Sequence, residues 1–177
     1  MAVPDLMYTV CFCICGTEVL MIHRRKAPHL NRWNGLGGKI EPGESALANV
    51  VREVREEAGI DLQSSTQLSF RGIVTWNLRP GIDQEQGMFV FVAQLQKDDS
   101  RTRPLPRCDE GTLAWIPIER ACDRSNNDIA DNLPFFLRDI IEGSELLQVR
   151  CVYDDHRLID VAVDHLHPGL VSPADIR

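Results

Sequence analysis

The chain has 177 residues, of which 44% are hydrophobic and 25% charged, and its formal net charge at pH 7 is −7. This length is ample for one hydrophobic core and short for two full domains. Because its basic residues cluster only at 23–26, we exclude a binder of duplex nucleic acid, which would need a basic surface. The apolar run at 10–15 is too short to cross a membrane and lacks the basic flank of a signal peptide.

The six cysteines stand at positions 11, 13, 15, 108, 122 and 151. The first three alternate, as residues on one face of a β-strand do, and their spacing is not the CxxC of metal sites. Without a secretion signal, reduced thiols are favoured over disulfides, and the chain is expected in the cytoplasm. A structural zinc site would need histidine partners that this spacing does not provide.

Hydrophobic periodicity and turn residues predict alternating strands and helices. In chain order the predicted elements are strands at 6–15 and 18–23, a short strand within 32–38, a helix at 46–58, strands at 67–77 and 87–96, a surface loop at 97–110, a strand at 113–116, a turn or short helix from 117, a helix at 131–142, and a hairpin of strands at 146–153 and 157–163 around Asp154-Asp155. These elements predict an α/β fold, with one domain at 1–165 and a loosely held tail at 166–177.

The helix at 46–58 has a clear beginning and end. Ser45 is a suitable N-cap and Gly59 a suitable stop. The residues expected to face the core are Leu47, Val50, Val51, Val54 and Ala58.

The segment 35–57 predicts a site for phosphate and metal. Glycines at 35–43 let the backbone approach an anion closely. On the helix, Glu53 and Glu57 are one turn apart, and Glu56 lies beside them. Crowded carboxylates repel one another unless cations neutralise them, and hard oxygen ligands suit Mg2+ or Mn2+. A solvated charged helix face is the commoner meaning of such a run, but the glycine loop in front of it favours the metal site.

Two further charged residues support this site. Arg52 can reach Glu56 one turn away and orient it, while Glu44 is better suited to holding the loop than to touching a reacting water. A polyphosphate would be repelled by the acidic helix edge unless metal ions bridged carboxylate and phosphate oxygens. The same ions would lower the pKa of a bound water. The expected chemistry is attack of an activated water on phosphorus, which cleaves a P–O–P bond.

From Gly38 to Ile60 the sequence reads GKIEPGESALANVVREVREEAGI. At every fixed position it resembles the box of the Nudix hydrolases, G-x5-E-x7-R-E-U-x-E-E-x-G-U, in which U is aliphatic. The resemblance implies the Nudix fold, an α/β/α sandwich with a mixed β-sheet and a catalytic loop–helix–loop. It also implies a pyrophosphohydrolase acting on nucleoside diphosphates linked to another group.

The resemblance further implies roles for individual residues. The expected metal ligands are Glu53 and Glu57 with the main-chain carbonyl of Gly38 or Gly37, and Glu56 is a ligand or helps to activate water. Glu110 stands where family members often place a further metal-binding or water-activating acid. The alternative for Glu110 is a solvent-facing loop pair with Asp109.

Upstream of the box, the segment RWNGLGGK at 32–39 is similar to a stretch of the oxidised purine nucleoside triphosphatases, the 8-oxo-dGTP diphosphatases of the MutT class. In that group the asparagine matching Asn34 forms hydrogen bonds with the purine base, and an amide has the donors and acceptor to do so. The alternative is that Asn34 is a turn residue before glycine. Arg24 matches a basic residue near the substrate in this class. Lys39 could assist phosphate binding or be merely exposed.

The resemblance weakens at 127–131, where those enzymes carry a Trp-Pro-Asp-Asp segment and this chain reads NDIAD. The stacking Trp is absent, and Asp128, Asp131 or Asn132 are the candidates to replace the paired acids. Trp76, at the end of a predicted strand, could stack on a base or pack in the sheet.

The predicted function is a Mg2+-dependent nucleoside triphosphate pyrophosphohydrolase, with Mn2+ as a substitute. Its expected substrates are 8-oxo-dGTP or related oxidised purine nucleotides, as in nucleotide-pool sanitation and DNA repair. Neither a nucleic acid polymer nor a membrane is an expected partner, and the oligomeric state is open. The alternative within the class hydrolyses ADP-ribose or dinucleoside polyphosphates. The alternative outside it is a nucleotide-binding regulator on a Nudix scaffold, which the intact box carboxylates disfavour.

Overall fold

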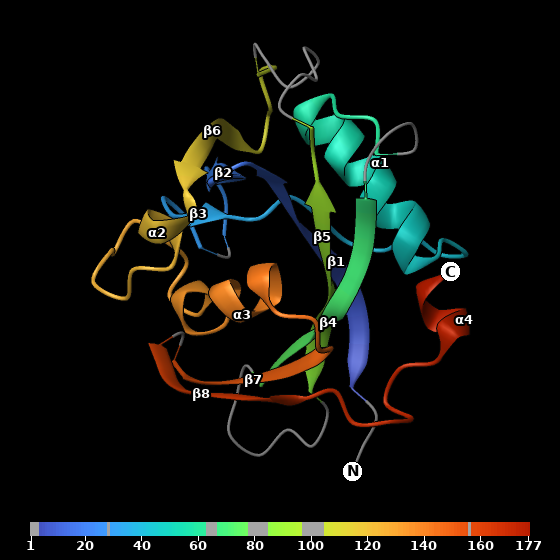
Figure 1. The fold of residues 1–177 in the computed structure, drawn as a ribbon. Helices are drawn as coiled ribbons and strands as arrows, with labels where there is room; N and C mark the ends of the chain where they lie inside the picture. The colour runs from blue at the N-terminus through green and yellow to red at the C-terminus, as the bar shows by residue number, and fades with distance from the viewer. Residues whose placement is uncertain (1–3, 28, 63–66, 78–84, 97–104, 156) are drawn as a thin grey trace.

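The computed structural model describes residues 4–27, 29–62, 67–77, 85–96, 105–155 and 157–177. Figure 1 shows a curled β-sheet with α1 on one side and α3 on the other. The strands are β1 (Asp5–Cys15), β2 (Glu18–Arg24), β3 (Trp33–Asn34), β4 (Gln67–Asn77), β5 (Gln86–Gln94), β6 (Gly111–Pro117), β7 (Leu147–Asp154) and β8 (Arg157–His165). The helices are α1 (Ala46–Ala58), α2 (Ile118–Ala121), the 3₁₀ helix η2 (Leu133–Phe135), α3 (Leu137–Glu142) and α4 (Pro173–Ile176).

Across the described ranges the sheet has eight strands, in the order β3-β2-β1-β5-β4-β7-β8, with β6 paired to β2 beside that path. It is mixed, as predicted: β1 runs parallel to β5 and β4 parallel to β7, whereas β1–β2, β4–β5 and β7–β8 are antiparallel. Every predicted strand is present with slightly shifted ends. Part of the expected loop at 97–110 lies outside the described residues.

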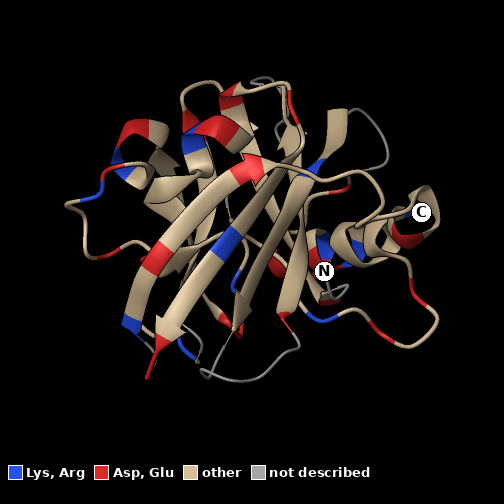
Figure 2. Ribbon diagram, turned by 90° about the horizontal axis from the view of Figure 1, so that it is seen from below, with Lys and Arg blue, Asp and Glu red and all other residues tan. Residues whose placement is uncertain are grey.

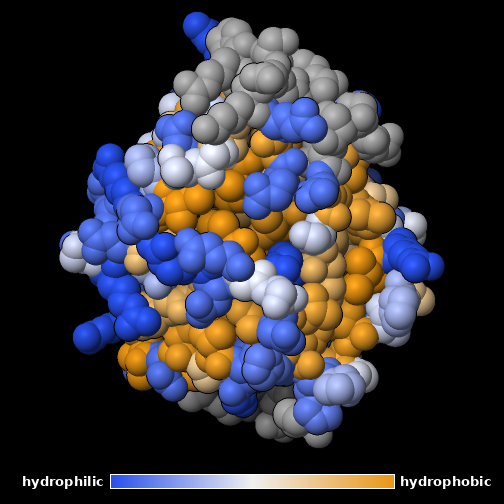
Figure 3. All heavy atoms as spheres, in the orientation of Figure 1, coloured by the Kyte–Doolittle hydropathy of each residue, from blue (hydrophilic) through white to orange (hydrophobic). Residues whose placement is uncertain are grey.

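Each face of the sheet has its own hydrophobic core. Along β1, Val10, Phe12 and Ile14 pack on the side of α3, while Cys11 and Cys13 pack on the side of α1. This alternation confirms the predicted cysteine face, and all six cysteines are free thiols. On the face shown in Figure 3, hydrophobic residues are visible over the central part, with hydrophilic residues among and around them.

Both predicted ends of α1 are confirmed. The Ser45 hydroxyl accepts a hydrogen bond from the Ala48 amide at 3.1 Å, and Gly59 takes a left-handed φ of 69°. The buried residues of α1 are Ala46, Asn49, Val50, Val54, Glu57 and Ala58. The expectation for Leu47 is wrong: this residue is 39% exposed, whereas Val51 is partly buried against the core.

The single helix predicted at 131–142 is also wrong. The segment divides into η2 and α3, because Phe136 leaves the helical region with a φ of −136°. Pro134, which has no amide to donate, lies in the first turn of η2. The hydrophobic face survives the break, since Leu133, Leu137 and Ile140 are all buried in the core on this side of the sheet.

The segment 166–177 packs against the domain, which does not match the expectation of a loosely held tail. Leu166, Val171 and Ile176 are partly buried against the core under α1. A capping box at Ser172 begins α4, which lies near the start of α1 in Figure 1.

Charged residues are mixed over the surface. Figure 2 shows Lys and Arg scattered among Asp and Glu along the strands that face the viewer. None of the helices in the described part of the chain has the length and apolar composition needed to span a bilayer.

Candidate active site

The glycine loop meets α1 through Gly37. Its amide donates a hydrogen bond to Oε2 of Glu57 at 2.9 Å. Its φ of 143° favours glycine, and a Cβ atom there would lie 2.2 Å from the carbonyl oxygen of Thr9. The close approach of this loop to β1 therefore depends on a missing side chain.

Glu57 is a buried carboxylate, with 4% of its surface exposed. Its Oε1 atom is buried and has no hydrogen-bond partner among the described residues. Burial raises the pKa of Glu57 to about 8; the Gly37 amide opposes this rise, and the charges of Glu53 and Glu110 add to it. A buried carboxylate oxygen without a donor is costly unless a cation or a proton neutralises it.

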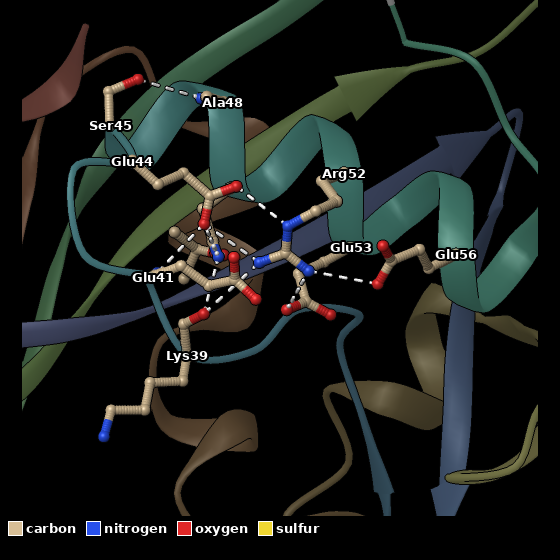
Figure 4. Close-up of polar contacts among 10 residues, drawn as sticks. Lys39, Glu41, Glu44, Ser45, Ala48, Arg52, Glu53 and Glu56 are labelled. Atoms are coloured by element: carbon tan, nitrogen blue, oxygen red, sulfur yellow. Dashed lines mark hydrogen bonds and ion pairs between the residues drawn. The ribbon is translucent and has the colours of Figure 1, made fainter.

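Arg52 holds three carboxylates together, as Figure 4 shows. Its Nε donates to Oε1 of Glu44 at 2.9 Å. Its Nη1 donates to Oε1 of Glu53 at 3.0 Å and to Oε2 of Glu56 at 3.1 Å. The contact expected between Arg52 and Glu56 is thus present, and the same guanidinium orients two more acids. The pKa of Glu53 is nevertheless raised, mainly by burial.

Glu44 anchors the loop to α1. Its Oε2 accepts hydrogen bonds from the Glu41 amide at 3.1 Å and from Nδ2 of Asn49 at 2.9 Å. The hydrogen bonds from Arg52 lower the pKa of Glu44 to about 2, so this carboxylate is charged at neutral pH. Its oxygens are engaged by protein donors, which suits a structural anchor better than a base.

Glu110 reaches the same site from the end of the loop before β6. Its charge contributes to the raised pKa values of both Glu53 and Glu57. Its carboxylate lies 3.9 Å from Nη1 of Arg24. The pairing of Arg24 with Gly111 in the β2–β6 register accounts for this proximity. The structure therefore brings Glu110 and Arg24 to the acidic residues of α1.

The oxygen donors of this cluster fit a divalent cation. Within the described ranges, no three His, Cys, Asp or Glu side chains lie close enough together, as arranged, to hold a metal ion. The fit rests instead on the unpartnered Oε1 of Glu57 and on carboxylates whose crowding a cation would relieve. Of the two main-chain candidates, the Gly38 carbonyl already accepts a hydrogen bond from the Thr9 amide at 2.9 Å, which favours Gly37.

Asn34 and Lys39 lie on either side of these glycines. Oδ1 of Asn34 accepts a hydrogen bond from the Gly35 amide at 2.8 Å, which is the turn contact considered as an alternative to base recognition. Lys39 contributes its main-chain carbonyl, which accepts from Nδ2 of Asn49 at 2.8 Å. Figure 4 shows the Lys39 side chain pointing away from Glu53 and Glu56.

Asp131 lies in a polar cluster at the surface. The Tyr153 hydroxyl donates to Oδ1 of Asp131 at 3.3 Å. Arg32 and His29 each place a nitrogen 3.9 Å from this carboxylate. Burial lowers the pKa of His29, and the charge of Asp131 opposes that shift.

The two other acid or amide candidates in this region have different surroundings. Asn132 is 6% exposed, and its Nδ2 donates to Sγ of Cys151 at 3.7 Å, so the amide faces the core. Asp128 is exposed and lies 3.6 Å from Arg120. Of the three, Asp131 has a partly exposed carboxylate that lies among the polar side chains of Tyr153, Arg32 and His29.

Trp76 is partly buried, and its ring centroid lies 6.2 Å from that of Tyr8. The half-buried residues that pack on the same core as Trp76 include Trp33, Met88 and Tyr153. Trp76 therefore contributes to packing while keeping part of its ring at the surface.

Asn49 and Thr9 were not among the predicted site residues. Both are buried, and both donate hydrogen bonds to carbonyl groups of the glycine loop. The available signal was a polar residue at a core-facing position of the predicted helix.

The geometry as a whole joins a glycine loop, an acidic helix edge and an acid from a distant loop into one oxygen-rich site.

A family model described as the NUDIX domain matches residues 5–137, so the chain belongs to the Nudix family. It has the α/β Nudix fold and is a Nudix hydrolase, an enzyme class that acts on phosphoric anhydride bonds. The fold and the enzyme class predicted from the box are both confirmed.

Similar proteins agree with this assignment. An uncharacterized Nudix hydrolase of Bacillus subtilis is 29% identical over 158 residues, which are 88% of this chain and 93% of that protein. An 8-oxo-dGDP phosphatase of Danio rerio is 40% identical over 81 residues, but these are 44% of this chain and 21% of that protein. The crystal structure of a MutT protein from Bacillus halodurans has a TM-score of 0.71 at 24% identity and covers 89% of this chain and 96% of its own. This last likeness shows the shared fold.

Proposed function

We propose that the enzyme is a Mg2+-dependent nucleoside triphosphate pyrophosphohydrolase, with Mn2+ able to substitute, that converts 8-oxo-dGTP or a related oxidised purine nucleotide to the monophosphate and pyrophosphate. The observation that carries the proposal is the buried Oε1 atom of Glu57, which has no hydrogen-bond partner among the described residues. The carboxylates of Glu53 and Glu110 lie close enough to raise the pKa of Glu57 further. Bound divalent ions would supply an activated water and neutralise charge on the leaving phosphate.

Each nearby residue has a role in this proposal. Glu53 and Glu57, with the Gly37 carbonyl, would hold the ions, and Glu56 or Glu110 would complete the ligands or help to activate water. Arg52 would orient Glu53 and Glu56 through the hydrogen bonds described above. Glu44 would keep the glycine loop in place. Arg24, close to Glu110, would meet substrate phosphate.

Recognition of an oxidised purine is supported by residues outside the box. The segment RWNGLGGK resembles a stretch of enzymes of that specificity, and the Danio rerio relative is named as an 8-oxo-dGDP phosphatase. Asp131, with its Tyr153 contact, and Asn34 are the proposed base contacts, and Trp76 would stack on the base. The six free thiols support a reducing compartment such as the cytoplasm, where nucleotide pools are sanitised.

A substrate panel tests this proposal. The purified enzyme is incubated with Mg2+ and 8-oxo-dGTP, dGTP, 8-oxo-dGDP, ADP-ribose or a dinucleoside tetraphosphate, and both products are separated by anion-exchange chromatography. We expect turnover of 8-oxo-dGTP well above that of dGTP, with pyrophosphate as co-product. Faster turnover of ADP-ribose or the dinucleoside polyphosphate would replace the proposal with the alternative within the class. No hydrolysis of any member by the folded protein would favour a nucleotide-binding regulator.

A further inference from the structure

Asn49 joins three parts of the active-site framework. It lies on α1 and is completely buried. Its Oδ1 accepts a hydrogen bond from Oγ1 of Thr9 at 2.6 Å. Its Nδ2 donates to the Lys39 carbonyl at 2.8 Å and to Oε2 of Glu44 at 2.9 Å. One amide group thus connects β1, the glycine loop and the carboxylate that anchors this loop.

These contacts form a closed ring with the main chain. The Thr9 amide donates to the Gly38 carbonyl at 2.9 Å, while the Thr9 hydroxyl donates to Asn49. Asn49 in turn donates to the carbonyl of Lys39, the residue after Gly38. Two successive carbonyl groups of the loop are therefore held by two buried residues, and neither of these residues is a fixed position of the Nudix box.

The ring determines where the loop stands relative to α1. A buried amide is costly unless its donors and acceptor are paired, and both donors and the acceptor of Asn49 are in use. A small shift of Gly38 would change its contact with Glu53, and a shift of Gly37 would change its hydrogen bond to Glu57. Misplacement of catalytic groups by about 1 Å can lower rates on the order of 100-fold.

We propose that Asn49 and Thr9 are positioning residues of this hydrolase. They hold the loop at 37–44 in the position relative to α1 that places Gly37 and Gly38 correctly against Glu57 and Glu53. The catalytic part of this inference rests on the proposed function. Their effect on the loop itself does not, because it follows from hydrogen bonds within the protein.

Four variants separate positioning from packing. Asn49→Asp keeps the shape and an acceptor but removes both donors and places a second carboxylate beside Glu44. Thr9→Val removes only the hydroxyl, and Thr9→Ser restores it. Thr75→Val is the matched control, because Thr75 is also fully buried in the sheet and its hydroxyl has no partner among the described residues.

The primary measurement is hydrogen–deuterium exchange of peptides covering 37–45, with kcat and KM measured per folded molecule. We expect faster exchange and a kcat about 10- to 100-fold lower in Asn49→Asp and Thr9→Val, with a smaller change in KM. Thr9→Ser should recover most of the activity, and Thr75→Val should match the wild type. If Asn49→Asp does not fold, the Thr9 and Thr75 variants decide the question.

Two results would overturn the inference. Unchanged exchange at 37–45 in folded Thr9→Val would show that the ring does not hold the loop. A lower melting temperature with an unchanged kcat would show that these residues only stabilise the fold. Failure of the proposed function is distinguishable: the wild type would hydrolyse no nucleotide in the panel, while the exchange experiment would still report on the loop.

Discussion

Gly38 and Glu53 are packed so closely that a Cβ atom on residue 38 would lie 2.4 Å from Oε1 of Glu53. The nearest obstacle is the movable end of a side chain, so an added methyl group would displace the carboxylate rather than the main chain. The glycine at this position therefore protects the placement of a proposed metal ligand.

Gly38→Ala should consequently reduce activity more than stability. We expect a fall in kcat on the order of 100-fold, because the Glu53 carboxylate is moved by about 1 Å, with little change in melting temperature. Steady-state kinetics and a thermal melt of the same preparation measure the two effects. Activity close to that of the wild type would show that Glu53 need not be held where it is.

Gly37→Ala should do the reverse and destabilise the fold. Its φ of 143° is unfavourable for alanine, and the Cβ atom would lie 2.2 Å from a main-chain oxygen of β1, which cannot move aside cheaply. We expect a loss of at least about 2 kcal/mol in the free energy of unfolding, measured by urea denaturation. Equal stability of the two alanine variants would contradict this distinction.

Glu57→Gln should change how stability depends on pH. In the metal-free enzyme burial raises the pKa of Glu57 from 4.5 to about 8, so the folded state binds more protons than the unfolded state in that interval. Stability contributed by the neutral form is therefore present below pH 4.5 and lost as pH rises to 8. The variant should lack this loss, which is on the order of a few kcal/mol. Urea denaturation of both proteins, with a metal chelator present, is measured at pH 5 and pH 8. The same change in the free energy of unfolding between these pH values in both proteins would refute the explanation.

Arg52→Lys should lower kcat without unfolding the enzyme. Lysine cannot reproduce the forked contacts that Arg52 makes with Glu44, Glu53 and Glu56. We expect a fall of about 10- to 100-fold, as for other residues that orient ligands. In the wild type the hydrogen bonds from Arg52 lower the pKa of Glu44 from 4.5 to about 2. They therefore contribute to stability above pH 4.5, and this contribution is lost as pH falls towards 2. A variant with unchanged kcat would remove Arg52 from the proposed catalytic set.

Asn34→Asp separates the two interpretations of Asn34. The substitution retains an oxygen for the Gly35 amide but removes the amide donors. If Asn34 reads the base, the ratio of kcat/KM for 8-oxo-dGTP to that for dGTP should change about tenfold, the worth of one hydrogen bond. An unchanged ratio, with both substrates still hydrolysed, would leave Asn34 as a turn residue.

Local signals were sufficient to predict the strands and α1. The alternation of Cys11 and Cys13 with apolar neighbours, and the caps at Ser45 and Gly59, depend on neighbouring residues alone. The break at Phe136 and the exposure of Leu47 were not predictable in this way. Both depend on how the helical segments meet the sheet, and periodicity reports only which residues share a face.

In the candidate site, too, local spacing predicted some features, while others depend on how distant segments pack together. The spacing of the box predicts that Glu53, Glu56 and Glu57 share a helix edge, but not that Glu57 is buried while Glu56 is exposed. The arrival of Glu110 depends on the β2–β6 pairing, which joins distant segments. The roles of Asn49 and Thr9 appear only when the loop is placed against β1.

The most direct test of the proposed metal site is a calorimetric titration of Mg2+ or Mn2+ into the wild type and into Glu57→Gln, each with a non-hydrolysable nucleotide present. We expect the wild type to bind the ion and the folded variant to bind it at least about tenfold more weakly. A wild-type enzyme that takes up neither ion, or a variant that binds as tightly as the wild type, would contradict the assignment of this helix edge as the metal site.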